Sequence, residues 1–150
     1  MNICCFAGHS EIYNSNLVFD MIMYKAEELI TQKNINEFWV GNYGAFDYIS
    51  ANAVRKLKKK YPDILLVLII PYLTKEINEY REQYYKNYDE MVIAEIPEKT
   101  PKKYRILKTN EYMVDNSNYL ICFINHSWGG TAKTLEYAER KKHITIFNLA

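Results

Sequence analysis

The chain has 150 residues, of which 49% are hydrophobic and 25% charged, with a formal net charge of +1 at neutral pH. This length and balance suit one globular unit with its own core, so we expect residues 1–150 to form a single domain. The near-neutral charge argues against a broad basic face for nucleic acid, and the absence of a leader-like N-terminus or a run of about 20 apolar residues predicts a cytoplasmic protein.

Six strand-like runs recur along the chain. They lie at residues 3–7, 37–40, 64–70, 91–94, 119–124 and 144–147. Helical segments are expected between most of them, at residues 17–33, 47–60, 75–88, 102–117 and 131–142. This alternation predicts an α/β fold, with a Rossmann-like parallel sheet of five or six strands covered by helices on both faces. The run at 64–70 is apolar throughout, which predicts the centre of the sheet.

The predicted helices bury apolar stripes. The first has Val18, Ile22, Ala26 and Leu29 on one side, and the second has Phe46, Ile49, Ala53 and Leu57. The third has the stripe Ile77, Tyr80, Tyr84 and Tyr88. We interpret these tyrosines as core-facing because each ring buries a large area, and stacking on a base or sugar is the alternative.

The helix predicted at 102–117 carries one polar residue on its apolar stripe. Asn110 shares that stripe with Ile106 and Met113, so it should face inward. A buried amide needs a hydrogen-bond partner, which would be either the backbone or a ligand.

The three cysteines lie in apolar runs. Cys4 and Cys5 are adjacent, and Cys122 is far away in the sequence, so the spacing fits neither a disulfide framework nor a metal site. We expect all three to be reduced and buried. His9 and His126 also lack neighbours at metal-ligand spacing, so we predict no metal and no resident cofactor.

Glycine-containing segments follow three of the predicted strands. They are Gly8, His9 and Ser10 after the first strand, Gly41, Asn42 and Gly44 after the second, and Trp128, Gly129, Gly130 and Thr131 after the fifth. Carboxyl ends of parallel strands share one edge of a sheet, where ligands bind at the topological switch point. Backbone N–H groups at such glycines and at a helix start can bind phosphate, whereas the alternative is that each segment forms only a tight turn.

Two carboxylates are candidates for chemistry. Asp47 either caps the second helix or holds a ribose, and Glu136 is either solvated or directed back towards the glycines. The sequence leaves both roles open.

Five segments taken in order resemble a known family. They are CCFAGHS at 4–10, FWVGNYGAFD at 38–47, YP at 61–62 leading into 66–73, NEYMV at 110–114, and GGT at 129–131 with the chain as far as 148. Together they resemble the YpsA-like branch of the SLOG superfamily, which is related to the LOG phosphoribohydrolases and to DprA. The resemblance implies a Rossmann-like fold that binds nucleotides or NAD-derived ligands.

The resemblance also implies which residues form the site. The implied pocket consists of Gly8, Gly41, Gly44, Asp47, Gly129, Gly130 and Thr131. The chain departs from the family pattern at Ser10 and Thr109, where arginines are frequent, and at Trp128, which replaces the proline of PGGxGTxxE. The loss of these cations and the altered motif weaken the transfer of hydrolase activity to Glu136.

These observations leave three hypotheses for function. The first is a module that senses or sequesters a nucleotide or an NAD- or ADP-ribose-like molecule, without chemistry. The second is an N-glycosidic-bond hydrolase or transferase, similar to LOG or to nucleoside deoxyribosyltransferases, with Glu136 or Asp47 as catalytic carboxylate. The third is a DprA-like binder of single-stranded DNA. The sequence names neither the ligand nor the pathway, and it leaves a homo-oligomer open.

Overall fold

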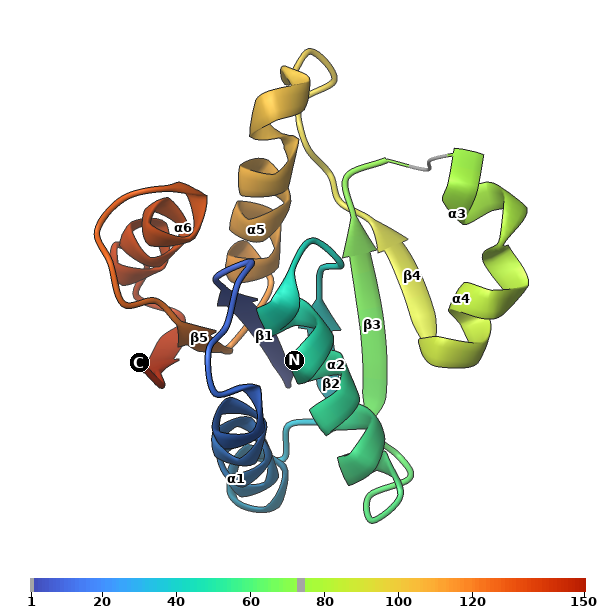
Figure 1. The fold of residues 1–150 in the computed structure, drawn as a ribbon, viewed down its shortest axis with the longest axis vertical. Coiled ribbons are helices and arrows are strands. Elements are labelled where there is room, and N and C mark those ends of the chain that lie inside the picture. Colours follow the sequence, from blue (N-terminus) through green and yellow to red (C-terminus); the bar gives the residue numbers. More distant parts are fainter. Residues whose placement is uncertain (1, 73–74) are drawn as a thin grey trace.

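The computed structural model describes residues 2–72 and 75–150 (Figure 1). Residue 73, the last of the family-like segment at 66–73, therefore lies outside the described residues. The strands are β1 (Ile3–Gly8), β2 (Glu37–Val40), β3 (Leu65–Ile70), β4 (Glu90–Ile93), β5 (Tyr119–Phe123) and β6 (Thr145–Asn148). The helices are α1 (Ser15–Lys33), α2 (Ala45–Lys58), α3 (Lys75–Glu79), α4 (Arg81–Asn87), the short 3-10 helix η1 (Lys102–Tyr104), α5 (Arg105–Asp115) and α6 (Gly130–Glu139).

The strands form one parallel sheet in the order β4-β3-β2-β1-β5-β6. This confirms the predicted Rossmann-like α/β architecture. From β1 the chain adds β2, β3 and β4 on one side, and then it crosses back to place β5 on the other side of β1. The direction of winding therefore reverses between β1 and β5, and a crevice is expected at their carboxyl ends.

The prediction that β3 lies at the centre of the sheet is wrong. β1 and β2 are the two middle strands, and β3 is second from the edge. β3 is apolar on both faces because helices cover both of them even at that position. Its odd residues, such as Val67, join one core, and its even residues, such as Leu66 and Leu68, lie on the opposite face.

Two cores lie on the two faces of the sheet. On one face α1 and α2 pack through the predicted stripes, with Val18, Ile22 and Phe46 against Phe6 and Phe38. On the other face Met113 and Val114 of α5, together with Ala132 and Ala138 of α6, pack against strand residues such as Cys5 and Cys122. These layers hold the carboxyl ends of the strands in fixed positions.

Two predicted helices are interrupted. The helix predicted at 75–88 is divided into α3 and α4, and Tyr80 between them is 49% exposed, so only part of the tyrosine stripe faces the core. Tyr84 and Tyr88 are half-buried and pack against Leu68, Ile70 and Ile77. The helix predicted at 102–117 begins with η1, and Ile106 is exposed instead of lying in the core.

The cysteines agree with the prediction. Cys4, Cys5 and Cys122 are buried with free thiols. Burial raises the pKa of Cys5 and Cys122 to about 12 and that of Cys4 well above its usual value. Across the described part of the chain, no helix combines the length and the apolar character needed to cross a membrane.

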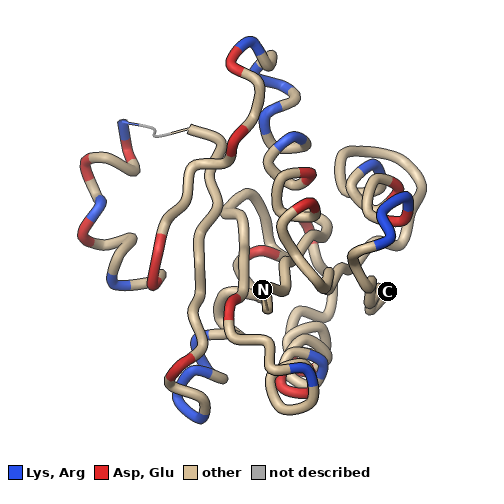
Figure 2. Tube along the Cα trace, turned by 180° about the vertical axis from the view of Figure 1, so that it is seen from behind, with Lys and Arg blue, Asp and Glu red and all other residues tan. Residues whose placement is uncertain are grey.

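Charged residues lie mainly around the periphery of the sheet. Figure 2 shows Lys and Arg residues close together where η1 and α5 begin, at the end of α5 next to the carboxyl edge of the sheet. Lys102, Lys103 and Arg105 belong to this segment. A cationic segment therefore lies beside the edge at which ligands are expected.

Candidate functional site

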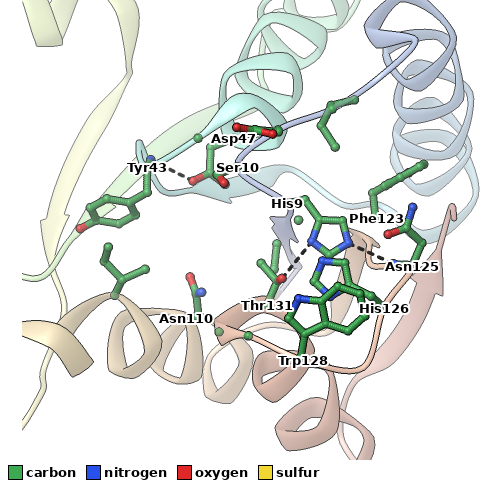
Figure 3. Close-up of a pocket in the computed structure, with 18 of the residues that line it drawn as sticks. His9, Ser10, Tyr43, Asp47, Asn110, Phe123, Asn125, His126, Trp128 and Thr131 are labelled. Carbon is green, nitrogen blue, oxygen red and sulfur yellow. Dashed lines mark hydrogen bonds between the residues drawn. The ribbon is translucent and has the colours of Figure 1, made fainter.

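A pocket of about 980 Å³ lies at the switch point between β1 and β5. Three of its walls come from the segments that follow β1, β2 and β5, and the fourth comes from η1 and α5. Ten of the sequence-predicted residues line it: Gly8, His9, Ser10, Gly44, Asp47, Asn110, Trp128, Gly129, Gly130 and Thr131. Segments that are far apart in the sequence therefore converge at one edge of the sheet (Figure 3).

Two of the glycines bring the ends of β1 and α2 into close contact. A Cβ atom added at Gly8 would lie 2.3 Å from Cγ of the buried Phe46, and one added at Gly44 would lie 2.5 Å from Cα of Ser10. The backbone also joins these segments, because the Ala45 N–H donates to the carbonyl of Ser10 over 2.9 Å. Gly8 and Gly44 are thus required for packing of the pocket wall.

Gly129 and Gly130 have a different environment. A Cβ atom added at either residue would meet nothing within 4 Å, so both face open space. Gly129 has φ of 90°, which favours glycine, and it is the N-cap of α6, which begins at Gly130. The first N–H groups of a helix have no partner within the helix, and its N-terminus carries partial positive charge. The start of α6 therefore offers donors to the pocket.

His9 holds the loop between β5 and α6 at both of its ends. Its Nε2 accepts a hydrogen bond from the Asn125 N–H over 3.0 Å, and its Nδ1 lies 3.1 Å from the Thr131 Oγ1. Burial and the neighbouring His126 lower the pKa of His9. The neutral imidazole thus links the end of β1 to the start of the loop and to the start of α6.

Two carboxylates line the pocket, those of Glu11 and Asp47, and Asp47 is the one considered from the sequence. It lies in the first turn of α2, but Gly44 is the N-cap, so Asp47 does not cap the helix in the predicted way. Its Oδ2 instead accepts a hydrogen bond from the Tyr43 N–H over 3.1 Å. Burial raises the pKa of Asp47 to about 6, which this hydrogen bond only partly opposes. A carboxyl group with such a pKa can exchange a proton near neutral pH.

Asn110 reaches the pocket from α5. Its Nδ2 donates to Oγ1 of Thr134 on α6 over 3.3 Å, so the partner found is a side chain and neither of the two predicted, the backbone or a ligand. Tyr43 lies on the opposite wall, and its hydroxyl is buried without a hydrogen-bond partner among the described residues. Both groups border the space that a ligand would occupy.

Three predicted residues do not line this pocket. Gly41 is buried behind it, where an added Cβ would lie 3.0 Å from Oδ2 of Asp47. Asn42 lines a second cavity of about 310 Å³ that also contains Lys102 and Arg105. Glu136 is exposed on α6 and lies outside both cavities, because the helix directs it away from the glycines.

The sequence analysis missed several lining residues. Residues 11–14, between β1 and α1, form one side of the pocket, and Lys103, Ile106 and Leu107 form another. The long gap between the first predicted strand and the first predicted helix was the available signal for residues 11–14. Ile106 was assigned to the core because its spacing matches the α5 stripe, but it lies in the first turn of α5, where the face that it shares with Asn110 borders the pocket.

The site has no metal-ligand cluster. Within residues 2–72 and 75–150, no group of three His, Cys, Asp or Glu side chains is arranged to hold a metal ion. What the pocket offers is backbone N–H donors, the cation of Lys103, the carboxylates of Asp47 and Glu11, amides, hydroxyls and aromatic rings. Such a set suits a polar organic ligand with a negative group.

The chain is similar to known proteins over most of its length. The family model described as the YspA SLOG family (YpsA) matches residues 6–148. The uncharacterized SPbeta prophage-derived protein YoqJ of Bacillus subtilis (strain 168) is 26% identical over 136 residues, which are 81% of this chain and 80% of YoqJ.

Among solved structures, the X-ray structure of DNA processing protein A (DprA) from Streptococcus pneumoniae superposes with a TM-score of 0.65 at 15% identity. The match covers 97% of this chain but only 49% of DprA, so the chain spans about half the length of that protein. At this identity the similarity concerns the fold.

Proposed function

The chain belongs to the YspA SLOG family, and on that premise we propose that its pocket binds a nucleotide or a nucleotide-derived molecule such as ADP-ribose. In this proposal the protein is a sensor or a sequestering module. The binding site is the pocket between the segments that follow β1, β2 and β5.

The observation that carries the proposal is the open start of α6. Gly129 and Gly130 line the pocket and an added Cβ at either would meet open space, and α6 begins there with N–H groups that have no partner within the helix. This is the usual arrangement for binding a phosphate group at a helix N-terminus. Thr131 lies on the same turn and adds a hydroxyl group.

Three cations lie on one side of the two cavities, and the carboxylates of Glu11 and Glu76 lie elsewhere on their linings. Lys103 lines the pocket, and Lys102 and Arg105 line the adjoining smaller cavity on the same segment. Tyr43 borders both cavities, so an extended phosphate group would lie within reach of these cations. Asp47, on the far side from α5, would accept hydrogen bonds from ribose hydroxyls.

Asp47 also favours a second candidate function, the cleavage or transfer of an N-glycosidic bond. A half-buried carboxyl group with a pKa of about 6 can act as nucleophile or as general acid and base at neutral pH. Glu136, the other carboxylate considered, is exposed outside the pocket. In an enzyme, Asp47→Asn would retain binding of AMP but lose release of free adenine, whereas a sensor would release none.

Binding of single-stranded DNA has less support. DprA is a DNA processing protein by name, but the similarity is at the level of the fold. Lys103 is the one cation among the described residues that line the larger pocket. A single DNA strand carries a phosphate on every nucleotide, so a site that contacts several of them would need more cations. Its affinity for DNA would also fall steeply as the salt concentration rises.

Native mass spectrometry tests the proposed function. Freshly purified protein should carry a co-purified nucleotide or should gain the mass of AMP or ADP-ribose after incubation. Gly130→Val should lose that mass, and the surface variant Lys59→Ala should retain it. Absence of any complex with both AMP and ADP-ribose in the wild-type protein would contradict the proposal.

A further inference from the structure

Three aromatic side chains form a column beside Gly129 and Gly130 at the start of α6. His9 and His126 stack with ring centroids 4.0 Å apart at 17°, and His126 and Trp128 stack at 4.0 Å and 19°. Phe123 meets His9 edge-on at 6.5 Å and closes the inner end of the column. Figure 3 shows the rings lying one over another next to Thr131.

The inner part of the column is held firmly. His9 is fixed by its contacts with Asn125 and Thr131, and His126 lies between two rings. The ring of Trp128 is therefore held on one face. The outer end of the column is open, because Trp128 is 70% exposed although it belongs to the pocket wall. A large apolar ring held in place but left in water presents a ready stacking surface.

Trp128 also directly precedes Gly129 and Gly130 in the chain, so its ring adjoins the predicted phosphate position. A nucleotide has its aromatic base and its phosphate joined by one sugar. A sugar phosphate without a base would use the start of α6 but would leave the ring of Trp128 in water.

We propose that the free face of Trp128 stacks on the base of the ligand, so that the site selects nucleotides over sugar phosphates. The base extends the column of His9, His126 and Trp128 by one more ring. Purines are favoured over pyrimidines because their two rings cover more of the indole. This inference rests on the proposed function, since it assigns the base to one part of that same pocket.

Tryptophan fluorescence gives a direct readout of the stack. The chain has two tryptophans, and Trp39 is 7% exposed and stacks on Tyr112 in the core. Quenching by an added base therefore reports on Trp128. AMP should quench the emission, with excitation at the red edge of the indole band where adenine does not absorb. Ribose 5-phosphate should bind without quenching.

Substitution of Trp128 separates stacking from phosphate binding. Trp128→Leu should weaken AMP binding by about fivefold or more, because stacking of a base on an aromatic ring contributes at least that much. The affinity for ribose 5-phosphate should not change, and Trp128→Phe should retain most of the AMP affinity. Thermal melts of both variants should match the wild type, since Trp128 is exposed.

The outcomes distinguish the two proposals. If AMP binds without quenching and Trp128→Leu binds AMP as tightly as the wild type, the stacking inference is overturned while the pocket assignment stands. If the wild type binds neither AMP, ADP-ribose nor ribose 5-phosphate, the proposed function fails and the inference fails with it.

Discussion

The Nδ1 atom of His9 lies 3.1 Å from the Oγ1 atom of Thr131, a residue that follows it by 122 positions. A backbone N–H can only donate, so the hydrogen bond from Asn125 identifies Nε2 as the unprotonated nitrogen. Nδ1 then carries the proton and donates to Thr131. One neutral ring therefore fixes the loop that carries Trp128 and the start of α6.

Replacing His9 by alanine should loosen this loop. Two hydrogen bonds and two ring contacts are lost, and we expect the free energy of unfolding to fall by about 1–3 kcal/mol. The affinity for ADP-ribose should fall as well, because the N–H donors of α6 lose their support. Urea denaturation and titration of ADP-ribose measure the two effects. Wild-type values for both would show that the His9 contacts do not hold the site.

His9 also predicts a dependence of stability on pH. Because its pKa is lowered in the folded protein, the unfolded chain binds more protons below pH about 6.5. The contribution of His9 to the free energy of unfolding is therefore fully present above that pH, and it is lost as the pH falls towards the pKa of His9 in the folded protein. The decrease should be smaller in His9→Gln, which does not titrate. Equal acid sensitivity of the two proteins would contradict this assignment.

Asp47 makes the stability of the fold depend on pH in the direction opposite to that of His9. Its pKa rises from 3.8 to about 6, so the folded state binds the extra proton and stability is lost as the pH rises through this range. Such a rise corresponds to at most about 3 kcal/mol, and access of water from the pocket reduces it. Asp47→Asn should raise the free energy of unfolding by about 1–2 kcal/mol at pH about 7 and leave it unchanged near pH about 4. A destabilised variant at neutral pH would contradict this prediction.

The packing of Gly8 predicts a severe loss of stability. A Cβ at this position would lie 2.3 Å from Cγ of Phe46, whose ring is fully buried and cannot move aside. Gly8→Ala should therefore cost about 1–3 kcal/mol or more. Gly130→Ala is the matched control, because its Cβ meets nothing. Differential scanning calorimetry should show a lower Tm for the first variant only, and equal melts would refute the close contact.

The three thiols should be inert in the native state. The thiolate is the reactive form, and burial raises the pKa of all three cysteines. A chromogenic disulfide reagent should label none of them rapidly at neutral pH and all three in urea. Fast labelling of two thiols in the native protein would contradict the buried positions of Cys4 and Cys5.

Much of the fold was predictable because simple periodicity determines it. The buried stripe of α1 was predicted correctly as Val18, Ile22, Ala26 and Leu29. A helix that packs on one face of a sheet buries one of its own faces, and that face shows in the sequence as a helical period. The apolar pattern of β3 showed that it is covered on both faces but not where it lies in the order, because strand order depends on the crossovers.

The site was predictable in part. The glycines after β1 and β5 were brought together as expected, because parallel strands end at one edge. The stack of His126 on His9 depends on loop geometry, and the exposure of Ile106 depends on where the first turn of α5 lies relative to the sheet. Spacing in the sequence cannot encode either feature. Glu136 was a candidate only by its place in a motif, and its helix directs it into solvent.

Titration calorimetry with ADP-ribose and AMP on Gly130→Val tests the central claim most directly. The added side chain enters open pocket space, so the account predicts an unchanged Tm and affinity lowered by about tenfold or more through the loss of N–H contacts. The wild type and Lys59→Ala should bind equally well. If Gly130→Val binds every nucleotide that the wild type binds, with the same affinity, the pocket at the start of α6 is not the nucleotide site.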